Sequence, residues 1–197
     1  YAWNRVAWAG IYALGIFAKE SAIVLPALLA LLHVHVQATT DAGDAHAWRR
    51  GWRAFRPMYL VLVAVALAAL WARGAALGDT SVAPNTALEG LTLSQRVATM
   101  LSVVPEWLRL FVWPARLIPV YSPPYIHIAP RFDAAAVPGV LTLLAAIVIA
   151  FRAARSSASH GIALGLEWIA VSLAPVSNIV FATGIVLAER TLFLPSV

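Results

Sequence analysis

Two acid–base pairs stand in otherwise apolar sequence. Lys19 is followed by Glu20 in Ala-Lys-Glu-Ser-Ala-Ile-Val-Leu-Pro, and Glu189 is followed by Arg190 in Leu-Ala-Glu-Arg-Thr-Leu-Phe-Leu-Pro-Ser. A fixed ammonium or guanidinium group binds phosphate oxygens well, and a neighbouring carboxylate can orient it. The pairs therefore predict binding of a lipid phosphate. The alternatives are a polar hairpin turn for the first pair, and for the second a mutual ion pair or a helix end reaching toward water.

A proline-rich stretch carries a second group of polar side chains. Residues 113–133 read WPARLIPVYSPPYIHIAPRFD, a proline density that excludes a regular helix. On this rigid frame stand Tyr121, Ser122, Tyr125, His127 and Arg131. Aromatic and hydroxyl groups on a preorganised loop suit contact with a sugar or a phosphate. The alternative is a structured loop without a ligand, and His127 taken alone fits a hydrogen-bonded loop residue better than a base.

The sequence offers few other reactive groups. Cysteine is absent, which excludes disulfides, thiolate zinc sites and a cysteine nucleophile. His33 and His35 stand two residues apart, so a helix directs them to different faces and a metal site there is not expected. We find no glycine-rich phosphate loop and no Ser-His-Asp arrangement. No cofactor is therefore predicted, and a divalent metal is left open.

Composition indicates an integral membrane protein. Of 197 residues, 61% are hydrophobic and 12% are charged, whereas soluble domains have about 45–50% apolar and about 25% charged residues. Uncharged runs cover residues 59–72 and 134–151, and a soluble core would need polar faces that the sequence lacks. The predicted fold class is all-α, a polytopic transmembrane helix bundle of about five spans. The expected spans are residues 6–18, 21–36, 58–72, 134–151 and 162–182.

Polar and proline-containing stretches divide these spans. A tight turn at Lys19-Glu20 splits the first apolar stretch, because a charged pair within one span would be costly. A polar loop over residues 37–56 is expected to end at Pro57, which suits a first helical position. A long outer loop then follows over residues 73–133.

The outer loop is expected to carry a helix of its own. Residues 96–112 have a helical pattern but include Glu106 and Arg109, which favours an amphipathic helix lying at the membrane interface. Trp107 and Trp113 would anchor it there, since tryptophan prefers the boundary between lipid and water.

Short basic loops predict the orientation. The net charge is +5, and the arginines lie at the ends of apolar runs, so they indicate topology and not contact with nucleic acid. Loops 49–56 and 152–160 should both be cytoplasmic. Counting spans from them places Lys19-Glu20, the loop over residues 73–133 and Glu189-Arg190 on the same non-cytoplasmic face.

Three segments resemble one family. AKESAIVLP, LAPVSNIVFATGIVLAERTLFLPSV and LTLSQRVATMLSVVPEWLRLFVWPARLIPVYS are similar, in order and spacing, to segments of the transmembrane and tetratricopeptide-repeat-containing O-mannosyltransferases and their bacterial relatives. The resemblance covers most of the chain, and the Ala-Glu-Arg segment is its most specific part. Many relatives carry an acidic residue before the aromatic-Ser pair. Here Val120 precedes Tyr121, so an acid role for this loop is not carried over.

The resemblance implies a glycosyltransferase of the GT-C class. Such enzymes take a sugar from a polyprenyl-phosphate carrier and transfer it to an acceptor hydroxyl. In this family the sugar is mannose and the acceptor is Ser or Thr of proteins. The expected partners are the lipid bilayer, the lipid-linked sugar donor and a protein or glycan acceptor, with no nucleic acid. Lys19 and Arg190 would bind the carrier phosphate, with Glu20 and Glu189 orienting them. The expected location is a bacterial inner membrane, with the active face toward the periplasm.

The chain is expected to be an internal fragment of a longer protein. Residues 1–197 form a single membrane-embedded domain in this interpretation, and the family's catalytic carboxylate would lie in an outer loop before Tyr1. Two alternatives remain: a transporter or flippase-like protein, and a non-catalytic anchor for a repeat domain. A transporter should place ionisable residues near the middle of the bilayer, and an anchor has no need of three motifs on one face.

The predicted orientation can be tested by labelling, because the chain has no cysteine of its own. Arg50→Cys and Ser157→Cys should be shielded from a membrane-impermeant thiol reagent in intact cells, whereas Asn85→Cys should react. Labelling of Ser157→Cys from outside would overturn the orientation, and all three should react after the membrane is permeabilised.

Overall fold

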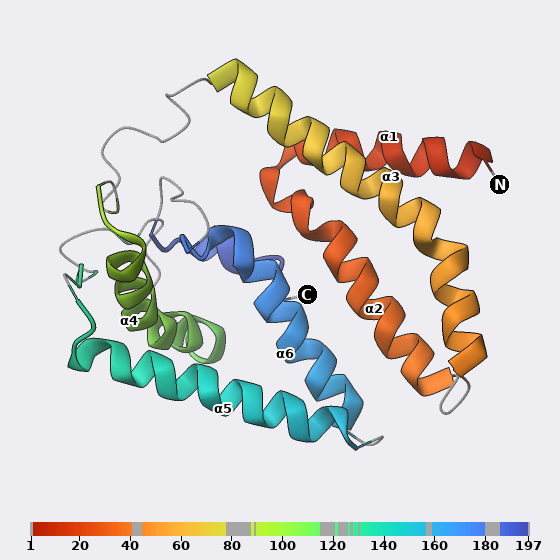
Figure 1. The fold of residues 1–197 in the computed structure, drawn as a ribbon. Helices are drawn as coiled ribbons and strands as arrows, with labels where there is room; N and C mark the ends of the chain where they lie inside the picture. Colours follow the sequence, from red (N-terminus) through yellow and green to blue (C-terminus); the bar gives the residue numbers. More distant parts are fainter. Residues whose placement is uncertain are drawn as a thin grey trace. The chain divides into compact units, whose positions relative to one another are not determined.

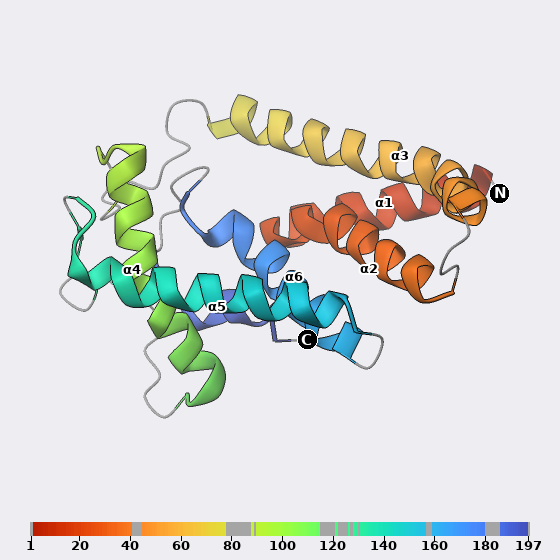
Figure 2. The same ribbon diagram turned by 60° about the horizontal axis from the view of Figure 1, so that its bottom comes forward.

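The computed structural model describes residues 2–40, 45–77, 88, 90–114, 121, 126, 128–129, 131–156, 159–179 and 186–196. These residues form helices, turns, bends and one isolated bridge, and no strand occurs among them. The chain divides into two compact units, Tyr1–Ser81 and Val82–Val197. Each unit consists of packed helices (Figures 1 and 2), which confirms the predicted all-helical class.

A break at Lys19 separates the first two helices of the first unit. The elements here are α1 (Ala2–Ala18), the 3₁₀ turn η1 (Glu20–Val24) and α2 (Leu25–Thr40). Lys19 takes extended backbone angles, φ −154° and ψ 122°, which end the helix. The Tyr12 hydroxyl donates to the Ile23 carbonyl at 3.1 Å and ties the two sides of the break together. The helix end predicted at residue 18 is therefore confirmed.

Helix α3 corrects the predicted loop over residues 37–56. It spans Ala45–Leu77 and contains Pro57 in its interior, so Pro57 is not a first helical position. The arginines of this region stand on the helix. Alanine and arginine favour helix, and proline within a membrane helix is tolerated. The helix bends along its length (Figure 1), as expected where proline removes a backbone hydrogen bond. It also continues past residue 73, where the long loop was expected to begin.

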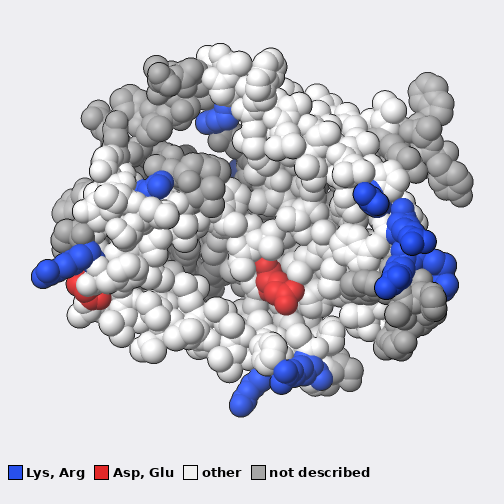
Figure 3. Space-filling view, viewed as in Figure 1, with Lys and Arg blue, Asp and Glu red and all other residues white. Residues whose placement is uncertain are grey.

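Large apolar side chains are exposed in both units. Phe17 is 75% exposed and Trp71 is 76% exposed, and the surface in Figure 3 is largely uncharged. Exposed apolar area on this scale is typical of contact with lipid. By length and composition, three described helices could cross a membrane: Ser21–Thr40, Arg49–Ala76 and Ala134–Ala154. The shorter apolar helices are Val6–Ala18 and His160–Val176, and the count of about five spans stays a prediction.

The described residues of the second unit form three α-helices and short 3₁₀ turns. Its elements are α4 (Leu93–Val112), η3 (Ala134–Ala136), α5 (Val137–Ala154), α6 (His160–Leu173), η5 (Ala174–Val176) and η6 (Glu189–Leu192). Helix α4 begins three residues before the predicted start, because Thr92 and Gln95 form a reciprocal capping box. The predicted segment 134–151 is helical and extends to Ala154.

Helix α4 supplies the core of this unit. Met100, Val103, Trp107 and Leu110 are buried in one apolar cluster together with Leu187. Trp107 is 9% exposed, so its predicted role as an interfacial anchor is wrong: its ring fills the protein core. Trp113 is 70% exposed and agrees with that role. Sequence periodicity gave the helix, but not which of its faces is buried.

The predicted span 162–182 ends early. Helix α6 stops at Leu173, the turn η5 follows, and Asn178 takes a left-handed backbone conformation with φ 57°. Pro175 lacks the N–H that a continuing helix would need, and its ring obstructs the preceding turn. The prediction placed the end too late because the residues that follow are also apolar. The sequence Ala-Pro-Val-Ser-Asn marks where the helix ends.

Helices α4 and α5 cross at a glycine. A Cβ atom added at Gly139 would lie 1.8 Å from the carbonyl oxygen of Leu101, a backbone atom of α4. Gly139 is buried, and the two helices pack against each other (Figures 1 and 2). Only a residue without a side chain permits this approach, so Gly139 fixes how α5 lies on α4.

Gly139→Ala should therefore destabilise the protein, because the methyl group forces two backbones apart. Overpacking of this kind costs at least about 1–3 kcal/mol, which corresponds to a fall of roughly 2–12 °C in Tm. Thermal unfolding of the detergent-solubilised protein measures it. Gly165→Ala is the matched control, since nothing lies within 4 Å of its added Cβ. Equal Tm values for the two variants would contradict the close crossing.

Candidate functional site

Tyr121 joins the proline-rich stretch to the segment 186–196. Its backbone N–H donates to the carbonyl of Leu187 at 2.9 Å, which forms an isolated antiparallel bridge. Both residues are buried, Tyr121 at 4% and Leu187 at 1% exposure. Two segments that are far apart in sequence are thus held together by a backbone contact.

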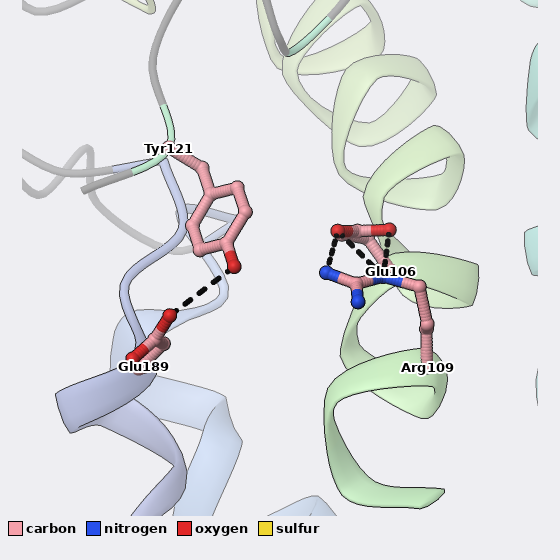
Figure 4. Close-up of polar contacts among 4 residues, drawn as sticks. All are labelled: Glu106, Arg109, Tyr121 and Glu189. Carbon is pink, nitrogen blue, oxygen red and sulfur yellow. Dashed lines mark hydrogen bonds and ion pairs between the residues drawn. The ribbon is translucent and has the colours of Figure 1, made fainter. Parts of the chain in front are cut away.

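The bridge brings a phenol to a carboxylate. The Tyr121 hydroxyl donates to Oε1 of Glu189 at 3.2 Å (Figure 4). Glu189 begins η6 and is half-buried. At 3.2 Å this is a long hydrogen bond, and it orients the phenol and the carboxylate toward each other.

An ion pair on α4 lies beside this contact. Arg109 Nε donates to Glu106 Oε1 at 2.9 Å and Oε2 at 3.0 Å, and Nη2 donates to Oε1 at 2.6 Å. The hydrogen bond to Glu106 raises the pKa of Arg109, against an opposing effect of desolvation, and Glu106 charge and Tyr121 add to the rise. The guanidinium therefore stays cationic, and Figure 4 shows it on the side of α4 that faces Tyr121.

A pocket of about 400 Å³ opens next to Glu189. Its lining residues are Leu110, Phe111, Pro114, Glu189, Leu192, Phe193 and Ser196. Of these, Glu189 alone carries a charge, and the remainder is mainly aliphatic and aromatic. Ligand pockets commonly combine such walls with a few placed polar groups. The arrangement suits an amphiphilic ligand with a hydrocarbon part and a polar head.

The structure brings together only some of the residues named from sequence. Tyr121 and Glu189 are in contact. Lys19 is exposed and belongs to the first unit. For Glu20 and Arg190 the structure describes the backbone alone, and Ser122 and His127 lie outside the described residues.

Sequence reasoning missed two contributors near the site. Glu106 and Arg109 were taken only as the polar face of an amphipathic helix, although their three-residue spacing on an apolar helix is the spacing of an ion pair. Among the described residues, no group of three His, Asp or Glu side chains is arranged to hold a metal ion.

Asn178 is a third contributor, and its buried side chain positions the backbone next to the site. Its side chain is fully buried and donates to the Val176 carbonyl at 3.3 Å and the Val186 carbonyl at 3.5 Å, with the Met100 sulfur at 3.8 Å. Val186 precedes the bridge residue Leu187. Asn178 therefore links the end of α6, the core of α4 and the segment that carries Glu189. The signal in the sequence was Pro-Val-Ser-Asn within the resembling segment.

Comparisons with known proteins identify no relative. No protein-family model matches the sequence, no curated protein matches it, and no solved structure matches the fold.

Replacement of Asn178 should separate the contribution of its side-chain hydrogen bonds from that of its left-handed backbone conformation. Asn178→Ala and Asn178→Gly both leave buried carbonyls without a donor, at about 1–3 kcal/mol. Alanine additionally strains the left-handed backbone by about 1–2 kcal/mol, which glycine avoids. Thermal unfolding in detergent should therefore rank wild type above Asn178→Gly and that variant above Asn178→Ala. Wild-type stability of Asn178→Ala would contradict the linking role.

Proposed function

We propose that the protein is an integral membrane glycosyltransferase that moves a sugar from a polyprenyl-phosphate carrier to an acceptor hydroxyl on the non-cytoplasmic face. The main observation in support of this proposal is the contact between Tyr121 and Glu189. Tyr121 belongs to the segment that ends in Val-Tyr-Ser and Glu189 to the Ala-Glu-Arg segment, and these are two of the three segments that resemble the O-mannosyltransferase family. Motifs that act on one substrate should lie together, and an isolated anchor has no need of this contact.

The surroundings of Glu189 support a lipid-linked donor. The pocket beside it has apolar and aromatic walls, and Arg109 on the neighbouring helix supplies a guanidinium held in place by Glu106. A polyprenyl-phosphate sugar combines a long hydrocarbon chain with a charged head, and apolar walls beside charged groups suit a ligand of this kind. The three apolar helices long enough to cross a membrane agree with such a substrate.

Charge development explains why cations are needed. As the sugar leaves its carrier, negative charge grows on the phosphate, and a positioned cation stabilises this transition state more than the ground state. We assign that role to Arg190, with Glu189 orienting it, and the resemblance adds Lys19. The acceptor hydroxyl must also lose a proton to a base. The family places that base in an outer loop which we do not assign to any residue of this chain.

Removal of either proposed cation should slow transfer. One charge-assisted contact contributes about 1.5–3 kcal/mol, so Arg190→Ala and Lys19→Ala should each reduce the rate roughly 10–150-fold. The assay follows radiolabelled mannose from polyprenyl-phosphate mannose to a Ser/Thr peptide in membranes that contain the protein. Protein level and Tm confirm insertion and folding.

Arg152→Ala is the matched control, because Arg152 is an exposed arginine of the loop expected on the cytoplasmic face, and its loss should change the rate less than about twofold. Full activity in both test variants would refute the phosphate-binding role. Movement of a lipid-linked sugar across the membrane of vesicles that contain the protein, without transfer of the sugar to the peptide, would favour the transporter alternative.

A further inference from the structure

The bent N-terminal part of α3 carries three arginines on one stripe. Arg49, Arg53 and Arg56 follow the spacing i, i+4 and i+7, which places them within about 60° around a helix of 3.6 residues per turn. All three are exposed. As residues of a loop they would have no common direction, so the stripe exists because α3 already begins at Ala45.

Packing on α2 sets the direction of the stripe. Trp52 stacks on His33 with ring centroids 5.0 Å apart, and Phe55 meets the same ring edge-on at 4.7 Å. The Tyr59 hydroxyl lies 3.0 Å from His33 Nδ1. These aromatic residues lie about a quarter turn around the helix from the arginines. The aromatic face is therefore held against α2 and the stripe is turned away from it.

The protein supplies no counter-charge to the stripe among the described residues. No hydrogen bond or ion pair joins Arg49, Arg53 or Arg56 to a described side chain. The Lys and Arg side chains gather in separate groups on a largely uncharged surface (Figure 3). Three guanidinium groups held within about 10 Å along one helix repel each other unless an external anion lies between them.

The length of α3 places the stripe at the level of lipid headgroups. The uncharged run of residues 57–72 measures about 24 Å at 1.5 Å per residue, against a hydrocarbon core of about 30 Å. Arg56 directly precedes this run, and Arg53 and Arg49 lie further from it along the helix. A helix that crosses a bilayer with this run must hold its arginines in the polar layer, which contains the lipid phosphates.

We propose that Arg49, Arg53 and Arg56 form a binding surface for the phosphates of anionic lipids in the adjoining leaflet. Guanidinium binds a phosphodiester through two parallel hydrogen bonds. Each basic residue next to a membrane-crossing helix raises the affinity for anionic lipid about fivefold, so three of them raise it on the order of 100-fold. The surface is independent of the proposed transfer reaction and of Glu189.

Lipid titration of the detergent-solubilised protein tests this surface. Dioleoyl phosphatidylglycerol or dioleoyl phosphatidylcholine is added in mixed micelles, and bound lipid is counted by native mass spectrometry. Replacement of the stripe by glutamine, Arg49→Gln with Arg53→Gln and Arg56→Gln, should weaken binding of phosphatidylglycerol roughly 30–100-fold. Binding of phosphatidylcholine should not change, and high salt should reproduce the loss in the wild type.

A matched control removes one isolated exposed arginine of the second unit, for comparison with the single variant Arg53→Gln. Arg131→Gln should change phosphatidylglycerol affinity less than about twofold, because Arg131 stands alone and Asp133 follows it two positions later. If the stripe variant does not fold, Arg53→Gln alone should lose about fivefold. An unchanged affinity in the stripe variants, or an equal loss in the control, would overturn the proposal. Competition by inorganic phosphate at equal concentration would assign the stripe to free anions and would also overturn it.

Discussion

Backbone hydrogen bonding is the constraint on which this structure depends. In an apolar environment every N–H and C=O must find a partner inside the protein, and helices meet that demand with local bonds. Where a helix stops, other partners must take over. At Lys19 the backbone N–H donates to Gly15 at 2.9 Å and the carbonyl accepts from Ala22 at 3.0 Å. After α6, the buried amide of Asn178 performs this task.

The two interruptions differ in what they make possible. The break at Lys19 is short, and the chain resumes a helix within a few residues. The break after Leu173 leads into a segment that does not return to α-helix among its described residues, and this segment presents Leu187 to the backbone of Tyr121. A regular helix would have satisfied its own backbone and left nothing for Tyr121 to bind. The site therefore exists because the helix ends early.

The sequence predicted the elements whose signal is local. The uncharged run at 134–151 and the helix end at residue 18 follow from composition and a single charged pair, and both are present. Errors arose where two local signals compete. Pro57 is compatible with a helix start and with a bend, and flanking helix-forming residues decided for the bend. Trp107 suits a membrane interface and a protein core, and only the packing of α4 chooses between them.

Part of the candidate site could also be predicted from the sequence, through the orientation of the spans. Orientation rules placed Tyr121 and Glu189 on one face, but no local pattern states that they touch. The pair Glu106 and Arg109 was visible as charge on an apolar helix, yet its proximity to Tyr121 depends on where the fold places Tyr121 relative to α4. Contacts between distant segments follow from the whole fold, which single-sequence patterns do not contain.

The contact between Tyr121 and Glu189 also sets an order of assembly. Its partners are separated by 68 positions, and the α5–α6 hairpin lies between them. Closing so long a loop is entropically unfavourable until the intervening chain is compact. Formation of the hairpin shortens this loop and so favours the contact between Tyr121 and Glu189. A chain halted during synthesis before residue 187 would hold all its long helices and still lack the site, so maturation of the site is coupled to completion of the second unit.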